Sequence, residues 1–423
     1  MSFKTISVIG LGYIGLPTAA MFASRNKEVI GVDVSEHAVN TINQGNLHIV
    51  EPELDVIVKD AVRKGFLRAT TSPQPADAFL ISVPTPLLPL GPDSSTPEPD
   101  LSHIKSASKA IAKVLKKGNL IILESTSPVG TTEQMAAWLA EERKDLTFPQ
   151  THGDSSDIRI VYCPERVLTG NAVSELVEND RVIGGMTKNC SKAAIEVYKI
   201  FLEGECLVTD ARTAEMAKLT ENASRDVSIA FANELSIICD KLDIDVWELI
   251  RLANHHPRVD ILQPGPGVGG HCIAVDPWFI VAKTPEHARI IQTARNINDE
   301  KSIWVVNKVK SELLKFLQSN IDRSPKDVVI AFYGLAFKAN IDDLRESPAL
   351  KVAEAITNVH TGPTLFVEPN ISARPLNLKR GELVDFKHAT DVADIHILLV
   401  NHSQFLRCRP KRGVVLDLQG IWS

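Results

Sequence analysis

Three glycines near the N-terminus, Gly10, Gly12 and Gly15, constrain the fold more than any other feature of the chain. They lie between the apolar run Ile6–Ile9 and the helical pattern Thr18–Ser24, so they occupy a turn from a strand to a helix. In such a turn the first glycine permits a tight bend, the second lets the backbone approach a pyrophosphate, and the third lets the helix pack on the strand. The spacing predicts a dinucleotide-binding unit whose helix N-terminus faces the pyrophosphate. The alternative is a tight turn without a ligand.

Asp33 indicates which dinucleotide the unit binds. It follows the next predicted strand, Glu28–Val32. A carboxylate at this place accepts hydrogen bonds from ribose hydroxyls and repels a 2′-phosphate. The sequence therefore predicts NAD rather than NADP as the cofactor.

The first half of the chain continues with alternating strand and helix patterns. Further strands are expected at Ala78–Val83, Leu120–Leu123 and Arg159–Tyr162, with a helix at His103–Leu115. This alternation is typical of a parallel, doubly wound sheet. Residues 84–99 contain six prolines and no periodicity, which predicts a loop at the carboxyl edge of that sheet.

A different pattern covers residues 213–253, where apolar residues recur at helical spacing and no strand is expected. One long helix or two helices would connect the halves and offer a surface for a dimer. After Pro325 strands are expected again, and Ser347-Pro348 predicts a helix start. Those strands are Val328–Tyr333, Thr364–Val367, Ile395–Val400 and Val414–Asp417. The fold class is therefore α/β, with two Rossmann-like doubly wound domains joined by a long helical connector.

Composition excludes several classes of protein. The formal net charge of -6 argues against nucleic-acid binding, which requires a surplus of basic residues. Six cysteines without a CxxC pair argue against a disulfide scaffold and against a zinc site, so no metal is expected. No secretory or membrane-spanning pattern is present, and a cytoplasmic location is the simplest expectation.

Cys272 is the candidate nucleophile. It follows Gly269-Gly270-His271 on a loop with little side-chain bulk, where glycines let a ligand approach the backbone. A thiol needs a cationic or helix-terminal environment to react near neutral pH, and His271 with a lysine from elsewhere would supply one. A small packing cysteine is the equally weighted alternative on local grounds.

Charged residues near strand and helix ends are the other candidates. Lys218, Asn222 and Arg225 share one helical face that suits a polyhydroxylated or anionic ligand, although a solvated face is the plainer interpretation. Glu165 and Arg166 follow a strand end, where ligands bind in doubly wound sheets. The alternative is a surface ion pair or a pair of turn residues. Gly334-Leu-Ala-Phe-Lys338 keeps one of the three glycines, so we expect a phosphate contact at Lys338 rather than a second dinucleotide.

Taken together, these segments resemble the UDP-glucose/GDP-mannose dehydrogenase family over essentially the whole chain. The matching segments are VIGLGYIGLP at 8–17, VPTP at 83–86, ESTSPVGTT at 124–132, CPERVL at 163–168, KLTEN at 218–222, GVGGHCIAVDP at 267–277 and GLAFKANIDDLRESPA at 334–349. The resemblance implies NAD-binding, connector-and-dimerisation and UDP-sugar-binding regions at 1–205, 206–315 and 316–423. The middle region would carry the catalytic cysteine loop.

The resemblance also implies a role for each matching residue. Cys272 takes the nucleophile position, Lys218 the acid/base and oxyanion position, Glu165 the position linked to thioester hydrolysis, and Asn222 and Asp276 those supporting the water and lysine. The cofactor contacts would be Gly10, Gly12, Tyr13, Ile14, Gly15, Asp33, Thr85, Thr126 and Arg345. The substrate contacts would be Arg166, Val167, Lys218, Asn222, Arg225, His256, Gly269, Phe337 and Lys338, with Arg258 reaching the sugar of the neighbouring subunit in a homodimer.

The implied reaction is a two-fold oxidation of a UDP-sugar at C6 by two NAD. The segment HPRVDILQPGPGVGGHCIAVDPWFIVA most resembles the family members that act on UDP-N-acetyl-D-mannosamine. That resemblance implies this substrate and bacterial surface-polysaccharide synthesis of the enterobacterial common antigen type. UDP-N-acetylglucosamine and UDP-glucose are the alternatives. Val275 and Gln419 replace basic residues of relatives. A β-hydroxyacid dehydrogenase and a non-catalytic NAD-binding regulator are the rival functions, and neither explains the Gly-Gly-His-Cys loop.

Overall fold

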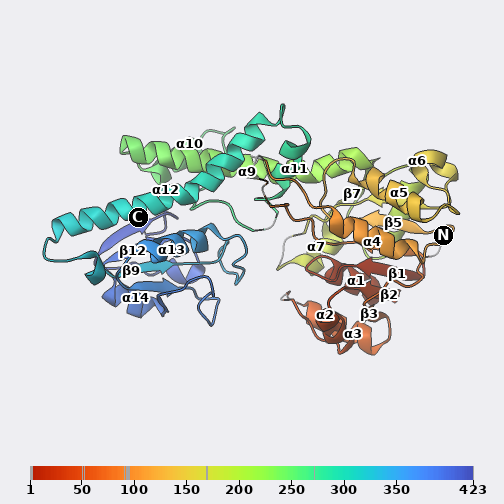
Figure 1. Ribbon diagram of the computed structural model, residues 1–423, viewed down its shortest axis with the longest axis horizontal. Helices are drawn as coiled ribbons and strands as arrows, with labels where there is room; N and C mark the ends of the chain where they lie inside the picture. Colours follow the sequence, from red (N-terminus) through yellow and green to blue (C-terminus); the bar gives the residue numbers. More distant parts are fainter. Residues whose placement is uncertain are drawn as a thin grey trace. The chain divides into compact units, whose positions relative to one another are not determined.

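The computed structural model describes residues 3–49, 51, 53–89, 91, 96–167, 170–270 and 272–422. The chain divides into two compact units, Met1–Glu221 and Asn222–Ser423. Each unit contains its own sheet, and each is described by itself (Figure 1). No helix in the described residues is long and apolar enough to cross a membrane.

The first unit is built on an eight-stranded sheet with the order β3-β2-β1-β4-β5-β6-β7-β8. Its strands are β1 (Thr5–Ile9), β2 (Glu28–Val32), β3 (Leu67–Thr70), β4 (Ala78–Ile81), β5 (Leu120–Leu123), β6 (Arg159–Tyr162), β7 (Arg181–Gly185) and β8 (Cys206–Asp210). All neighbours are parallel except β6 and β7. The predicted doubly wound arrangement is confirmed, but the expectation of a wholly parallel sheet is wrong, because β7 and β8 run against the other six strands.

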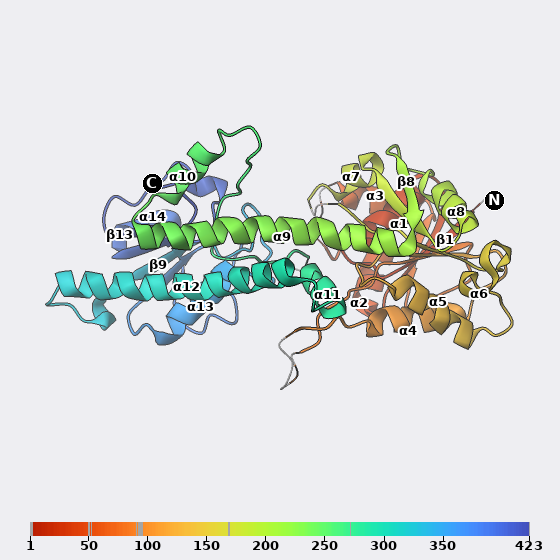
Figure 2. The same ribbon diagram turned by 90° about the horizontal axis from the view of Figure 1, so that it is seen from above.

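Helices cover both faces of this sheet, because alternate strand residues point to opposite sides. Leu80 and Ile122 pack in a core with one group of helices, and Ile81 and Ile121 pack in a second core. The first group is α1 (Gly15–Ser24), α2 (Glu36–Asn43), α3 (Leu54–Arg63), α7 (Ala172–Glu178) and α8 (Lys188–Tyr198). The second core includes α4 (Ser102–Ala112) and α5 (Thr131–Glu142), which lie side by side, and α6 (Pro149–His152) follows α5 (Figure 2).

The proline-rich segment 84–99 is described in part. Leu87 and Pro99 form an isolated antiparallel bridge, and the Leu88 N–H donates to the Glu98 carbonyl at 2.7 Å. Residues 90 and 92–95 lie outside the described residues. The described part of the segment is irregular, as predicted.

The connector contains two helices, α9 (Ala211–Leu242) and α10 (Val246–Ala253). This settles the choice between one helix and two. The break comes at Asp243, which has a positive φ of 57°, and Asp245 caps α10 by accepting the N–H groups of Trp247 and Glu248. Figure 2 shows α9 as one uninterrupted helix.

In the second unit, α11 (Asp276–Lys283) leads into α12 (Arg289–Ser319), which the sequence analysis did not predict. Polar side chains join α12 to the part of α9 in this unit. Asp226 pairs with Arg295 at 2.6 Å, and Lys301 donates to the Ser236 hydroxyl at 2.5 Å. Several of these polar groups are buried, which hides the apolar periodicity expected of a packed helix.

The second sheet is five-stranded and parallel, with the order β11-β10-β9-β12-β13. Its strands are β9 (Ile330–Tyr333), β10 (Thr364–Val367), β11 (Glu382–Leu383), β12 (Ile395–Leu398) and β13 (Val414–Asp417). Residues of α12 and α13 (Pro348–Val359) pack in one core, and α14 (Phe386–Val392) packs in another. Ser347 caps α13 and Pro348 begins it, as predicted. The two-domain α/β fold class is thus confirmed.

Candidate active site

The turn between β1 and α1 has the geometry that its three glycines predict. Gly10 has a φ of 91°, a conformation that other residues rarely adopt. A Cβ atom at Gly15 would lie 1.8 Å from the Gly10 carbonyl oxygen, whereas one at Gly12 would meet nothing described within 4 Å. Gly10 and Gly15 therefore serve the turn and its packing. Open space at Gly12 fits the close approach of a pyrophosphate.

Asp33 lies beside this turn at the end of β2. Its Oδ2 accepts the Leu11 N–H at 2.9 Å, and its Oδ1 accepts the Ser35 N–H at 2.9 Å. The residue is half-buried. Each carboxylate oxygen keeps a second lone pair, so ribose hydroxyls can still donate to it.

The predicted cofactor residues of the first unit meet at one edge of its sheet. Gly12, Tyr13 and Ile14 follow β1, and Thr85 and Thr126 follow β4 and β5. The Thr85 hydroxyl donates to the Thr126 carbonyl at 2.6 Å. Because β1, β4 and β5 are parallel neighbours, their carboxyl ends share an edge, which is where such sheets bind dinucleotides.

Glu165 is buried at the same edge, just after β6. Its Oε1 accepts the N–H groups of Arg166 and Val167 at 2.7 and 3.1 Å, and its Oε2 accepts Arg181 Nη2 at 2.8 Å. The alternative of a surface ion pair is therefore wrong for Glu165. Arg166, which is exposed, does form an ion pair, with Glu221 at 2.8 Å.

Lys218 and Asn222 occupy successive turns of α9, and Arg225 follows on the same face. Lys218 and Asn222 are half-buried, and Arg225 is exposed. Asn222 Nδ2 donates to Asp276 Oδ2 at 2.5 Å, although 54 positions separate the two residues. Asp276 is 3% exposed, so this amide gives a buried carboxylate a partner.

Cys272 is half-buried in the turn that leads into α11. Its carbonyl accepts the Asp276 N–H at 2.8 Å and the Val275 N–H at 3.0 Å. The cysteine is thus placed one turn before the helix N-terminus, which favours negative charge. His271, its expected cationic neighbour, lies outside the described residues.

The glycines before Cys272 pack against protein. A Cβ atom at Gly269 would lie 2.7 Å from the Glu346 carbonyl oxygen and 2.8 Å from Phe337 Cβ. Gly270 has a φ of 79° and faces the Phe337 ring. The described contacts therefore explain the small residues by close packing on the segment after β9, where the sequence analysis expected only the approach of a ligand.

The remaining predicted contacts lie mostly at the surface of the second unit. Lys338, Arg345, His256 and Arg258 are exposed, and Arg345 pairs with Asp343 at 2.6 Å. Gln419 donates from Nε2 to the Leu399 carbonyl at 2.7 Å. The Gln419 amide is thus hydrogen-bonded to the residue that directly follows β12.

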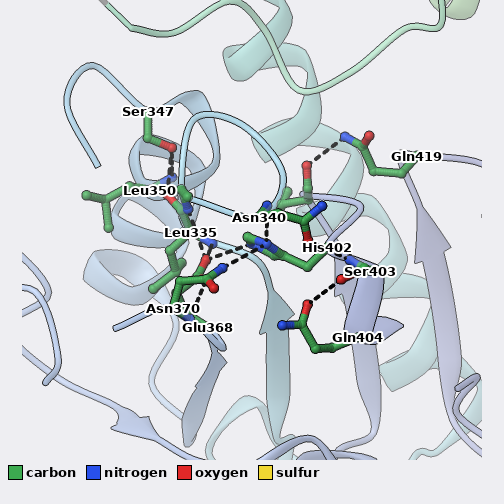
Figure 3. Close-up of polar contacts among 12 residues, drawn as sticks. Leu335, Asn340, Ser347, Leu350, Glu368, Asn370, His402, Ser403, Gln404 and Gln419 are labelled. Carbon is green, nitrogen blue, oxygen red and sulfur yellow. Dashed lines mark hydrogen bonds and ion pairs between the residues drawn. The ribbon is translucent and has the colours of Figure 1, made fainter. Parts of the chain in front are cut away.

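Sequence reasoning missed a buried network at the carboxyl edge of the second sheet (Figure 3). Glu368 Oε2 accepts the N–H groups of Leu335 and Ala336 at 2.7 and 3.1 Å and lies 3.0 Å from His402 Nε2. His402 Nδ1 accepts the Asn340 N–H at 2.9 Å. The network fixes the loop that carries Phe337 and Lys338. An acidic residue after an apolar strand, as at Asp33, was the signal for Glu368.

Within the described residues, no group of three or more His, Cys, Asp or Glu side chains could hold a metal ion.

Comparison with known proteins agrees with this geometry. Residues 4–202, 212–300 and 331–423 match the NAD binding, central and UDP binding domains of the UDP-glucose/GDP-mannose dehydrogenase family. The chain is 61% identical to a UDP-N-acetyl-D-mannosamine dehydrogenase of Yersinia pestis, with all of both chains covered. It is 58% identical to an NDP-N-acetyl-D-galactosaminuronic acid dehydrogenase of Ralstonia nicotianae, covering 100% of this chain and 97% of that protein.

Among solved structures, the UDP-D-ManNAc dehydrogenase of Pyrococcus horikoshii has a TM-score of 0.85 at 35% identity, with 99% of this chain and 96% of that chain covered. These matches extend over both sheets and the connector, and they favour the predicted family over both rival functions. The chain is therefore an NAD-dependent dehydrogenase and belongs to the UDP-glucose/GDP-mannose dehydrogenase family.

Proposed function

We propose that this enzyme oxidises the C6 alcohol of UDP-N-acetyl-D-mannosamine to the carboxylate, with two NAD reduced per sugar. The observation that carries the four-electron reaction is the position of Cys272, a cysteine one turn before Asp276 and its hydrogen bond with Asn222. A single oxidation to an aldehyde needs no covalent nucleophile, whereas a second oxidation benefits from one. The named relative from Yersinia pestis supports the choice of sugar.

The residues have distinct tasks in this mechanism. NAD, when bound at the β1–α1 turn, accepts the hydride in each oxidation. Lys218 stabilises the oxyanion while the Cys272 sulfur bonds to C6 of the aldehyde. After the second oxidation C6 is a thioester. Asn222 and Asp276 orient Lys218 and the water, and Glu165 takes a proton from the water that hydrolyses the thioester.

The proposal includes the arrangement of the chain. Residues 1–205 bind NAD, 206–315 carry the cysteine loop and the dimer surface, and 316–423 bind the UDP moiety. The enzyme acts as a homodimer in which Arg258 reaches the neighbouring active site. The exposed position of Arg258 is compatible with that role. We place the reaction in the cytoplasm, where NAD and nucleotide sugars are supplied, as a step towards surface polysaccharide.

The decisive experiment measures NADH formed from UDP-N-acetyl-D-mannosamine, UDP-N-acetylgalactosamine, UDP-N-acetylglucosamine and UDP-glucose. We expect the mannosamine derivative to give the highest kcat/KM and two NADH per sugar. One NADH per sugar would contradict the four-electron mechanism. A higher kcat/KM for the galactosamine derivative would favour the second candidate function, which the relative from Ralstonia nicotianae supports at nearly equal identity.

A further inference from the structure

The reversed direction of β7 has a local consequence at the carboxyl edge of the first sheet. Because β7 is antiparallel to β6, its first residue, Arg181, lies beside the segment that leaves the end of β6. A parallel β7 would begin at the opposite edge. The antiparallel pair thus brings an arginine to Cys163 and Glu165.

Arg181 is 4% exposed, and its positive charge is surrounded by two carboxyl groups and an aromatic ring. Its Nη2 donates to Glu165 Oε2 at 2.8 Å, and its Nη1 lies 3.7 Å from Glu124 Oε1. The guanidinium carbon lies 4.5 Å from the centre of the Tyr198 ring. Burial alone would lower the pKa of Arg181, but Glu165 and its other neighbours raise it well above its usual value.

The two carboxyl groups beside Arg181 differ in their partners. Glu124 accepts the hydroxyls of Tyr198 and Ser82 at 2.7 and 2.6 Å, and burial raises its pKa. Glu165 accepts two backbone N–H groups on one oxygen and Arg181 Nη2 on the other. Glu165 is therefore the closer counter-ion, and these three donors fix the direction of its carboxylate.

We propose that Arg181 is a positioning residue that holds the Glu165 carboxylate correctly aimed for the hydrolytic step. The inference rests on the proposed function of Glu165. In that step the water oxygen bonds to the thioester carbon, the C–S bond breaks, and its electron pair leaves on the Cys272 sulfur. One proton of the water passes to Glu165 Oε2, whose second lone pair remains available beside Arg181, and the second leaves as the product acid ionises.

The test separates hydride transfer from hydrolysis in Arg181→Met and Arg181→Lys. Rapid-mixing absorbance follows NADH, and intact-protein mass spectrometry detects the sugar acyl group on Cys272. We expect both variants to form up to two NADH per subunit in a burst and then to stall with the acyl-enzyme accumulated. Steady-state kcat should fall about 100-fold in Arg181→Met, and the apparent KM for the UDP-sugar should fall with it, because the slowed step follows formation of the acyl-enzyme.

Two comparison variants make the outcome specific. Arg212→Met removes an exposed ion pair with Glu133 in the same unit and should hydrolyse the thioester at the normal rate. Glu165→Gln should accumulate the same acyl-enzyme, and adding Arg181→Met to it should slow hydrolysis little further. The readout is the ratio of burst to steady-state rate, which a general loss of folded protein would leave unchanged.

The outcomes distinguish this proposal from the one on which it rests. Normal hydrolysis in Glu165→Gln would remove Glu165 from the step, which contradicts the proposed mechanism itself. Slow hydrolysis in Glu165→Gln with normal hydrolysis in the Arg181 variants would overturn the role of Arg181 alone. If Arg181→Met fails to fold, Arg181→Lys decides, because a lysine keeps the charge without the planar fork and should still slow hydrolysis about 10-fold.

Discussion

Asp33 and Glu368 occupy equivalent places in the two sheets. Asp33 directly follows β2 and accepts the Leu11 N–H at 2.9 Å, and Glu368 directly follows β10 and accepts the Leu335 N–H at 2.7 Å. Each leucine follows a glycine with positive φ, 91° at Gly10 and 87° at Gly334.

The surroundings of the two carboxylates differ. Asp33 is half-buried, whereas Glu368 is 4% exposed and hydrogen-bonded by His402 and Asn370. The two turns are similar, but the Asp33 carboxylate in the first sheet is accessible to a ribose. The Glu368 carboxylate in the second sheet is enclosed by protein groups. This supports the expectation that the second sheet binds no dinucleotide in the same way.

The glycine turn gives a prediction that separates folding from cofactor binding. Gly15→Ala should destabilise the protein by several kcal/mol, because its Cβ would meet the Gly10 carbonyl at 1.8 Å. Gly12→Ala should leave the melting temperature almost unchanged and weaken NAD binding, since its Cβ would enter the space proposed for the pyrophosphate. Thermal unfolding and calorimetric titration with NAD measure both effects. Equal NAD affinity in Gly12→Ala and the parent would place the pyrophosphate elsewhere.

Cys272→Ala should abolish carboxylate formation and retain NAD binding. The thiol forms the only covalent bond between enzyme and sugar in the proposed mechanism, so a loss of at least about 10³-fold in kcat is expected. Product analysis by chromatography together with NADH yield is the measurement. Cys408→Ala, at an exposed thiol, is the matched control and should be fully active. If Cys272→Ala forms two NADH per sugar, Cys272 is not the nucleophile.

The hydrogen bond between Asn222 and Asp276 predicts an asymmetric response to mutation. Asn222→Ala leaves the Asp276 carboxylate buried without its amide partner, so kcat should fall about 10²-fold and the protein should lose about 1–3 kcal/mol of stability. Asp276→Asn keeps the size of the side chain and should lower kcat with less loss of stability. Steady-state kinetics measures kcat, and urea unfolding measures the free energy of unfolding. A larger stability loss in Asp276→Asn than in Asn222→Ala would contradict this account.

Lys301 on α12 should make the free energy of unfolding depend on pH in the neutral to alkaline range. Burial lowers its pKa from 10.5 to about 7, so the unfolded chain binds this proton more tightly than the folded one. The buried amine therefore costs most stability below about pH 7, and the free energy of unfolding rises with pH between about 7 and 10.5, by at most about 1.4 kcal/mol per unit.

Lys301→Met should raise stability at pH 7 and remove that slope, because the Ser236 hydroxyl still donates to the Asn233 carbonyl. Lys310→Met, at an exposed position of the same helix, should change neither quantity. Urea unfolding across the pH range checks both variants. A parallel slope in Lys301→Met and the parent would show that the lysine stays charged.

The proposed exchange of Arg258 between subunits can be tested by mixing two inactive variants. Arg258→Ala and Cys272→Ala should each be inactive alone, but dissociation and reassembly together should restore activity. In a mixed dimer one site combines an intact Cys272 with an intact Arg258 from the other chain. Recovered NADH formation after mixing is the expected result. A mixture as inactive as its components would place Arg258 in its own subunit's site or outside the site.

The structural features that could be predicted from the sequence are those whose signals lie within a few residues of one another. The glycine turn, the cap at Ser347 and most strand positions were found because their signals lie within a few residues. Arg181 was missed because the sequence analysis expected no strand at β7, and a local pattern could not have revealed that this strand is antiparallel to β6. The hydrogen bond of Asn222 with Asp276 likewise required the fold. Helix α12 was missed because buried Arg295, Asn298 and Lys301 interrupt its apolar face.

Helix α9 limits how this chain can vary in length. Lys218 and Asn222 are held one turn apart by a helix without glycine or proline from Ala211 to Leu242. One inserted residue between them would rotate one against the other by about 100° and separate them by a further 1.5 Å or so along the axis. Insertions and deletions of a size that surface loops commonly tolerate would therefore inactivate the enzyme here. Related enzymes should preserve this residue count even where the side chains on the outer face of the helix have changed.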